Sequence, residues 1–66
     1  MREFKVNRNN IGSIEAWCVR YISPRKYYLP KQIGGHGWSI KRMYSTPTVA
    51  IEDDKVALMA IIKFGE

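Results

Sequence analysis

The chain has 66 residues, which is enough for one domain, so residues 1–66 are taken as a single domain. Eleven Lys and Arg against six Asp and Glu give a formal net charge of +5, which favours an anionic partner. A single cysteine, Cys18, excludes an intrachain disulfide, and a single histidine, His36, leaves a tetrahedral zinc site short of ligands. No metal and no cofactor is therefore expected.

The start of the chain and its apolar runs bear on location. Charged residues follow Met1 with no apolar run after them, so no signal peptide is expected. The longest apolar run, residues 56–62, is far shorter than the ~20 residues that span a bilayer. We therefore expect a soluble cytoplasmic protein without a membrane partner. A domain this small buries only about 60% of its unfolded surface, so a homo-oligomer is a further expectation.

The first predicted element is a strand over residues 2–6. Polar and apolar side chains alternate there, so Phe4 and Val6 share one face. Residues 7–12 are rich in Asn and Gly and predict a loop.

Residues 14–22 fit two structures. Their composition of Trp, Val, Tyr and Ile is typical of a strand, which would place Trp17, Val19 and Tyr21 on one face. Helical spacing of the apolar residues is the alternative, with Ser13 as the N-cap. We favour the strand, which ends before Pro24 in either case.

Residues 25–44 predict a β-hairpin. The first arm, residues 25–30, forms a sheet edge or stops at Pro30, because proline has no amide hydrogen to donate. Residues 34–37 contain three glycines, which suit a tight reversal, and residues 38–44 form the return strand. Its alternation places one set of side chains on one face and a second set on the other: Trp38, Ile40 and Arg42 against Ser39, Lys41 and Met43.

The C-terminal part predicts a turn at residues 45–47, a short strand at 48–51 and a helix over 52–65. Asp53 or Asp54 can cap the helix, and Gly65 suits its end; a buried strand over 55–64 is the alternative. The predicted fold is α+β, a small antiparallel sheet of three to four strands with one C-terminal helix packed across it. The expected core comprises Phe4, Trp17, Val19, Trp38, Ile40, Leu58, Ile61 and Ile62.

Candidate chemistry is sparse. The glycines lack the spacing of a phosphate-binding loop, and the acids at 52–54 lack the spaced oxygen ligands of a calcium site. Cys18 as nucleophile with His36 as its base is one hypothesis. A buried thiol and a solvated histidine in a turn is the interpretation we favour. We expect no catalytic residue and no enzymatic activity.

The most informative pattern is the mixture of basic and aromatic residues between positions 16 and 51, a stretch that contains no Asp or Glu. Aromatic faces stack on bases while Lys and Arg follow phosphates, and the same residue types anchor protein interfaces. The adjacent Tyr27 and Tyr28 point to opposite faces of a strand, so one of them is expected to be exposed. The predicted binding surface comprises Arg20, Arg25, Lys26, Tyr27, Tyr28, Lys31, Lys41 and Arg42.

These residues predict a non-enzymatic protein that binds and modulates or inhibits a macromolecule. The partner is a protein with an acidic surface or, alternatively, DNA or RNA bound without sequence specificity. Residues 51–65 and the turn at 34–38 resemble small early proteins of tailed bacteriophages, which often combine an aromatic β-hairpin with a final segment of this type. That resemblance implies a host-takeover protein that acts on a host macromolecule in the host cytoplasm. It assigns no function to individual residues.

Overall fold

The structure, a computed structural model, describes residues 1–42 and 46–64. Across these residues the chain forms five strands, two α-helices and a short 3-10 helix. In chain order the elements are β1 (Arg2–Lys5), η1 (Arg8–Asn10), α1 (Ile11–Tyr21), β2 (Arg25–Leu29), β3 (Gln32–Gly35), β4 (Trp38–Lys41), β5 (Thr48–Ile51) and α2 (Asp54–Phe64). The fold is α+β, as predicted, but the sheet has five strands where the sequence predicts three to four, and α1 is a second helix that the sequence does not predict.

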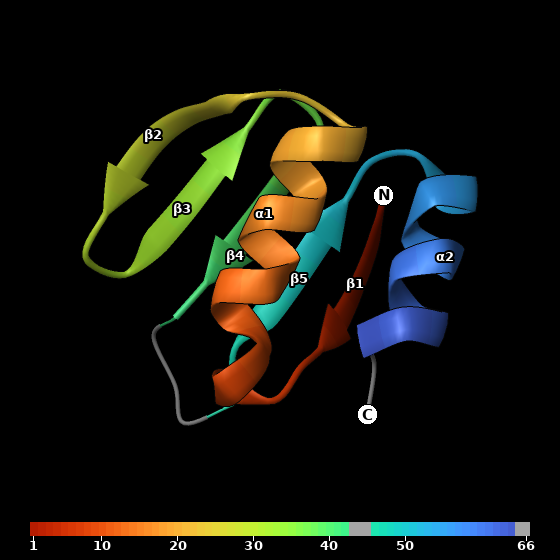
Figure 1. The fold of residues 1–66 in the computed structure, drawn as a ribbon, viewed down its shortest axis with the longest axis horizontal. Helices are drawn as coiled ribbons and strands as arrows, with labels where there is room; N and C mark the ends of the chain where they lie inside the picture. The colour runs from red at the N-terminus through yellow and green to blue at the C-terminus, as the bar shows by residue number, and fades with distance from the viewer. Residues whose placement is uncertain (43–45, 65–66) are drawn as a thin grey trace.

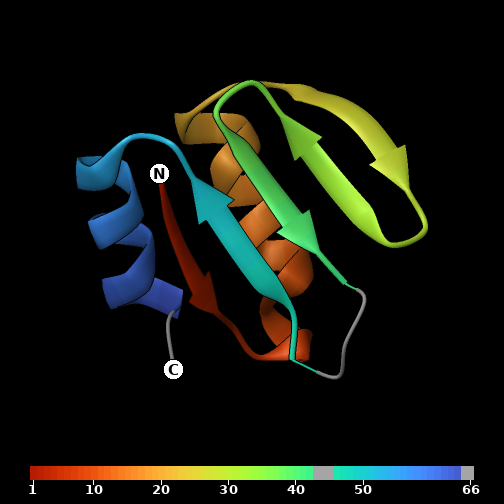
Figure 2. The ribbon, with the colours of Figure 1, turned by 180° about the vertical axis from the view of Figure 1, so that it is seen from behind.

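The five strands form a single antiparallel sheet in the order β1-β5-β4-β3-β2. Strands β2 to β5 follow one another as a meander, and β1 pairs with β5 at the far side. Helix α1 crosses one face of the sheet, and α2 stands beside β1 (Figure 1). Seen from behind, the opposite face carries no helix (Figure 2). We call these two surfaces the helix face and the open face.

The core lies between α1 and the helix face. Ile33 pairs with Ile40, which pairs with Val49, and all three side chains are buried. Helix α1 contributes Ile14, Trp17 and Cys18 from above. Alternation along each strand directs one set of side chains into this layer and leaves the other set on the open face.

The prediction of a strand over residues 14–22 is wrong, since Ile11–Tyr21 is helical. Ile14, Trp17 and Cys18 recur at helical spacing and are buried together, while Val19 is on the outer side and 40% exposed. Burying one side of a helix outweighs a strand propensity that is itself largely a measure of packing. The N-cap is Asn10, not Ser13.

The predicted turn at residues 34–37 is placed too early. Gly34 and Gly35 belong to β3, which lies between the two arms of the predicted hairpin, and of the described residues Gly37 alone has a positive φ, 89°. An added Cβ at Gly35 would collide with the Pro24 carbonyl oxygen and the Trp38 indole. Glycine is therefore needed at this strand position because neighbouring atoms approach its backbone closely. The prediction of a sheet edge at 25–30 is confirmed, because β2 is an edge strand.

The C-terminal helix is confirmed at Asp54–Phe64. Its cap is Asp53, whose Oδ1 accepts hydrogen bonds from the backbone N–H groups of Lys55 (2.9 Å) and Val56 (3.2 Å). Gly65 and Met43 lie outside the described residues. No helix in the described part of the chain is long and apolar enough to cross a membrane.

Three residues of the expected core are exposed. Val19 is on the outer side of α1, and Leu58 and Ile62 are 45% and 85% exposed on α2. Helix α2 instead buries the small side chains of Ala57 and Ala60. The expected burial of Trp17, Trp38 and Ile40 is confirmed, and Phe4 and Ile61 are partly buried.

Candidate binding surface

The sheet divides the predicted binding residues between its two faces. Tyr27 pairs with Gly34 and lies against it on the open face, where its hydroxyl accepts a hydrogen bond from Gln32 Nε2 at 3.2 Å. Tyr28 pairs with the core residue Ile33 and is 56% exposed on the helix face. The two tyrosines therefore cannot serve one flat surface.

On the helix face, two arginines lie over Tyr28. The guanidinium carbon of Arg25 is 4.8 Å from the ring centroid, and that of Arg42 is 5.3 Å from it. Arg25 Nη1 also donates to Glu15 Oε1 of α1 at 3.1 Å. This stack joins β2 to α1 and to the end of β4, and it leaves both guanidinium groups partly committed to contacts within the protein.

Arg42 holds the turn between β2 and β3. Its Nη2 donates to the carbonyl oxygens of Leu29 (3.3 Å) and Pro30 (3.2 Å). Its backbone N–H donates to the carbonyl oxygen of Lys31 (2.8 Å). Its Nε is buried and has no hydrogen-bond partner among the described residues. The guanidinium thus fixes the hairpin tip beside the end of β4.

On the open face, the register produces a row of polar side chains that crosses four strands. Lys5 pairs with Thr48, Thr48 with Lys41, and Lys41 with Gln32. Both lysines are exposed. Lys5 was not among the predicted binding residues. Alternation along residues 2–6 identifies its outward direction, but no local signal shows that β1 pairs with β5.

One end of the sheet is basic, whereas the opposite end carries charges of both signs, because Arg2 and Arg25 pair there with Ile51 and Gly35. Strands β1 and β4 end, and β3 begins, at one end of the sheet, and four cations meet there. We call this group the basic end; it comprises Lys5, Lys31, Lys41 and Arg42. Three acids, Glu52, Asp53 and Asp54, follow β5 at the opposite end. Between pairs of described residues the one ion pair is Arg25–Glu15, so no described acid lies within ion-pair distance of the basic end.

The remaining predicted residues lie elsewhere. Arg20 is on α1, with its guanidinium carbon 5.7 Å from the Tyr21 ring centroid. Lys26 occupies the irregular position where the pairing of β2 with β3 shifts between Arg25 and Tyr27. Of the eight predicted residues, the structure brings Lys31, Lys41 and Arg42 to one end of the sheet and adds Lys5 to them.

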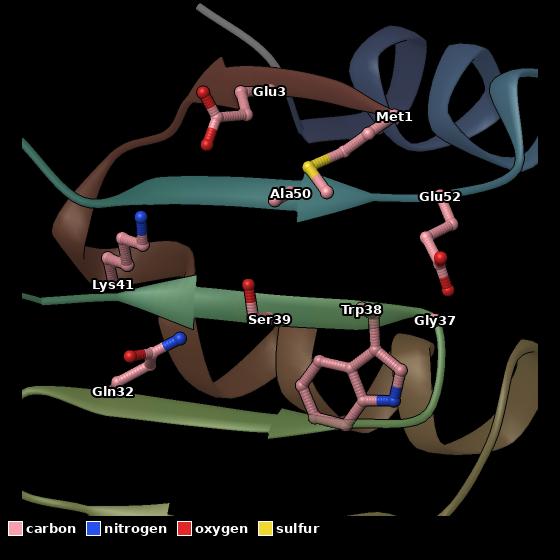
Figure 3. Close-up of a pocket in the computed structure, with 9 residues that line it drawn as sticks. All are labelled: Met1, Glu3, Gln32, Gly37, Trp38, Ser39, Lys41, Ala50 and Glu52. Carbon is pink, nitrogen blue, oxygen red and sulfur yellow. The ribbon is translucent and has the colours of Figure 1, made fainter.

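A shallow hollow of about 290 Å³ opens in the middle of the open face. Its floor is formed by Ser39 and Ala50, which pair with each other on β4 and β5 and have small side chains. Lys41, Glu3 and Glu52 stand around it (Figure 3). Two carboxylates on the rim oppose binding of a phosphate here. A second hollow, of about 270 Å³ between α1 and β2, is lined by Glu15, Ala16, Val19 and Arg25.

The two residues of the nucleophile hypothesis have different environments. Burial, with a smaller effect of the nearby Glu15 carboxylate, raises the pKa of the Cys18 thiol to about 12. His36 is exposed in the turn between β3 and β4. A thiol that stays protonated at neutral pH does not supply a nucleophile. Within residues 1–42 and 46–64, no three His, Cys, Asp or Glu side chains form a group that could hold a metal ion.

No family model, no curated protein sequence and no solved structure matches the chain. The candidate binding surface therefore rests on the geometry of this chain alone.

Proposed function

We propose that this is a non-enzymatic binding protein that docks its basic end and its β2–β3 hairpin on an acidic surface of another protein. The observation that carries the proposal is the meeting of Lys5, Lys31, Lys41 and Arg42 at one end of the sheet. Like charges gathered at one end of the molecule raise the local potential and attract a partner of opposite charge. Binding of this kind blocks the partner or recruits it.

The aromatic residues favour a protein partner over nucleic acid. Two guanidinium groups lie over Tyr28 and one lies over Tyr21. A base that stacks on either ring has to compete with those contacts. Tyrosine and arginine held in fixed positions are well suited to anchor a protein interface, because little side-chain entropy is lost on binding.

The resemblance to early phage proteins makes a host protein the partner in this proposal, and the host cytoplasm the place where they meet. Inhibition or redirection of that host protein is the expected consequence. This assignment depends on the resemblance, whereas the position of the interface depends on the basic end.

Nucleic-acid binding is the second candidate, because the polar row on the open face includes Lys5, Lys41 and Gln32 with Tyr27 beside it. A sheet face with lysines and an aromatic ring is a common surface for single strands. Glu3 and Glu52 stand around the hollow on that same face and weaken this alternative.

Charge reversal at the basic end tests the proposal. Lys31→Glu and Lys41→Glu are expected to lower affinity for the captured partner by about tenfold or more each, because an acidic partner then faces a like charge. Arg2→Glu is the matched control, since Arg2 is exposed at the other end of β1. The measurement is capture from host lysate with and without nuclease, followed by titration of the purified partner.

Three results are informative. Capture that survives nuclease and is lost in both lysine variants supports the proposal. Capture that nuclease abolishes favours the second candidate, for which log K then falls linearly with log salt concentration. Equal affinity for wild type and both lysine variants would remove the basic end from the interface.

A further inference from the structure

The rim of the hollow on the open face carries charges of both signs. Glu3 of β1, Lys41 of β4 and Glu52, the residue after β5, all line it with exposed side chains. Lys41 belongs to the basic end, so the hollow adjoins the proposed interface. The two carboxylates repel the acidic partner that the basic end attracts. An interface that meets acids alone therefore leaves these two carboxylates unexplained.

The sheet register places both carboxylates beside the floor of the hollow. Glu3 pairs with Ala50, which pairs with Ser39. Glu52 lies two residues beyond Ala50 on the same face, which is roughly 7 Å along the strand. Its Oε2 lies 3.6 Å from the position that a Cβ would take at Gly37. The two carboxylates therefore reach the hollow from β1 and from the end of β5.

Neither carboxylate has a partner within the described part of the chain. The one ion pair there lies elsewhere, between α1 and β2, and the side chains of Glu3 and Glu52 accept no hydrogen bond from a described residue. Arg2, next to Glu3 in β1, points to the helix face. Lys5 and Lys41 share the open face but lie one row away, at the basic end. Both carboxylates are thus available to a cation from another molecule.

We infer that the hollow accepts one lysine or arginine side chain of the protein partner. The inference rests on the proposed function and adds to it, because the partner then presents a basic side chain beside its acids. The volume of about 290 Å³ lies below the range of about 300–1,000 Å³ that is typical of small-molecule pockets, and it suits a single side chain. The stem of that side chain lies over Ser39 and Ala50, and its charged head contacts Glu3 and Glu52.

The order of the charges selects the partner. Lys41 stands at one end of the hollow and Glu52 at the other (Figure 3). Lys41 pairs with Thr48, four residues before Glu52, so the two are roughly 13 Å apart along the strand. A partner with an acid and a base at that separation satisfies both ends. A uniformly acidic surface places a negative charge against Glu52, and such like-charge contacts exclude wrong partners.

Neutralising the carboxylates tests the inference, because the basic end alone and the occupied hollow predict changes of opposite sign. Glu3→Gln and Glu52→Gln each remove a negative charge, so a partner that meets only the basic end should bind them more tightly. A partner that places a cation in the hollow should bind each variant about fivefold more weakly. Titration of the captured partner measures the affinity, and circular dichroism checks that each variant is folded.

Asp54→Asn is the matched control. It makes the same change in net charge in the first turn of α2, and Asp54 does not line the hollow. Its affinity for the partner is expected to equal that of wild type or to exceed it, because the electrostatic attraction to acids grows.

Small cations test the hollow without the partner. n-Propylguanidinium and n-butylammonium reproduce the ends of arginine and lysine side chains, and n-butanol is the uncharged control. The cations are expected to cause saturable shifts in the backbone amide NMR signals of Gly37, Ser39 and Ala50, which butanol does not cause. These shifts should disappear in the protein that carries both Glu3→Gln and Glu52→Gln. The cation with the larger response identifies the preferred side chain.

The outcomes separate this inference from the proposed function. Weaker binding by both glutamine variants, together with the cation-dependent shifts, supports the hollow as a site. Affinity that stays equal or rises in both variants, or cations that shift none of the three amide signals, would overturn it and leave the basic end in place. Weaker binding by both glutamine variants beside an unchanged Lys31→Glu would support the hollow and remove the basic end from the interface.

Discussion

Replacing Gly34 by alanine tests the position of Tyr27 on the open face. Alanine in a strand interior usually stabilises a protein by roughly 0.5–1 kcal/mol relative to glycine. Here we expect the opposite sign. The added methyl group would collide with the Tyr27 hydroxyl and lie 2.6 Å from its Cζ and 2.9 Å from the Trp38 carbonyl oxygen. The tyrosine ring or the backbone of β4 has to move.

The size of the effect follows from two opposing contributions. Overpacking of a filled site costs about 1–3 kcal/mol. Displacement of the ring also weakens the hydrogen bond between Gln32 Nε2 and the Tyr27 hydroxyl, 3.2 Å long. After the backbone gain of alanine is subtracted, the net loss of unfolding free energy is about 1–2 kcal/mol. For a domain of 66 residues, that loss lowers Tm by about 7–14 °C.

Thermal and urea denaturation followed by circular dichroism measure this loss. Gly12→Ala is the matched control, because Gly12 lies in α1 and its added Cβ has no described atom within 4 Å apart from its chain neighbours and its own helix backbone. That variant is expected to gain about 1 kcal/mol. In a Tyr27→Ala background the cost of Gly34→Ala should shrink without vanishing, because the Trp38 carbonyl remains. A Gly34→Ala protein as stable as wild type, beside a stabilised Gly12→Ala, would refute the position of the tyrosine ring.

Two further predictions concern α2 and Cys18. Asp53→Ala is expected to lower the unfolding free energy by about 1 kcal/mol in urea titrations, whereas Asp53→Asn keeps most of the cap; equal loss in both would contradict capping by its Oδ1. Because the pKa of Cys18 is about 12 when folded and 9.0 as a free thiol, the unfolded chain releases its proton first as pH rises. The stability of wild type relative to Cys18→Ala should therefore fall above about pH 9. A difference that stays constant between about pH 8 and pH 10 would show that Cys18 ionises equally in both states.

The sequence by itself determined the elements whose signals are local. Alternation identified the strand at residues 2–6 and the outward direction of Lys5. The acids before residue 55 predicted the start of α2 to within two residues and limited its cap to Asp53 or Asp54. Pro30 indicated that the hairpin arm is an edge or stops there, and β2 is an edge. Neighbouring tyrosines in a strand had to face opposite ways. Each of these follows from side-chain geometry within a few residues.

Only the tertiary structure decided the choices that depend on distant partners. Residues 14–22 carry both helical spacing and strand composition, and the sheet beneath them selects the helix. Gly34 and Gly35 are compatible with a turn or with a strand that has no room for side chains. They lie in a strand, where the rings of Tyr27 and Trp38 occupy the space of a side chain.

The same holds for the basic end and for the exposed side of α2. Lys5 lies in the same row as Lys41 because β5 pairs with both β1 and β4. Leu58 and Ile62 are exposed because α2 buries the side that carries Ala57 and Ala60. Local propensities differ by about 1 kcal/mol or less. Burial of large apolar side chains outweighs them, and which side chains are buried depends on segments from opposite ends of the chain.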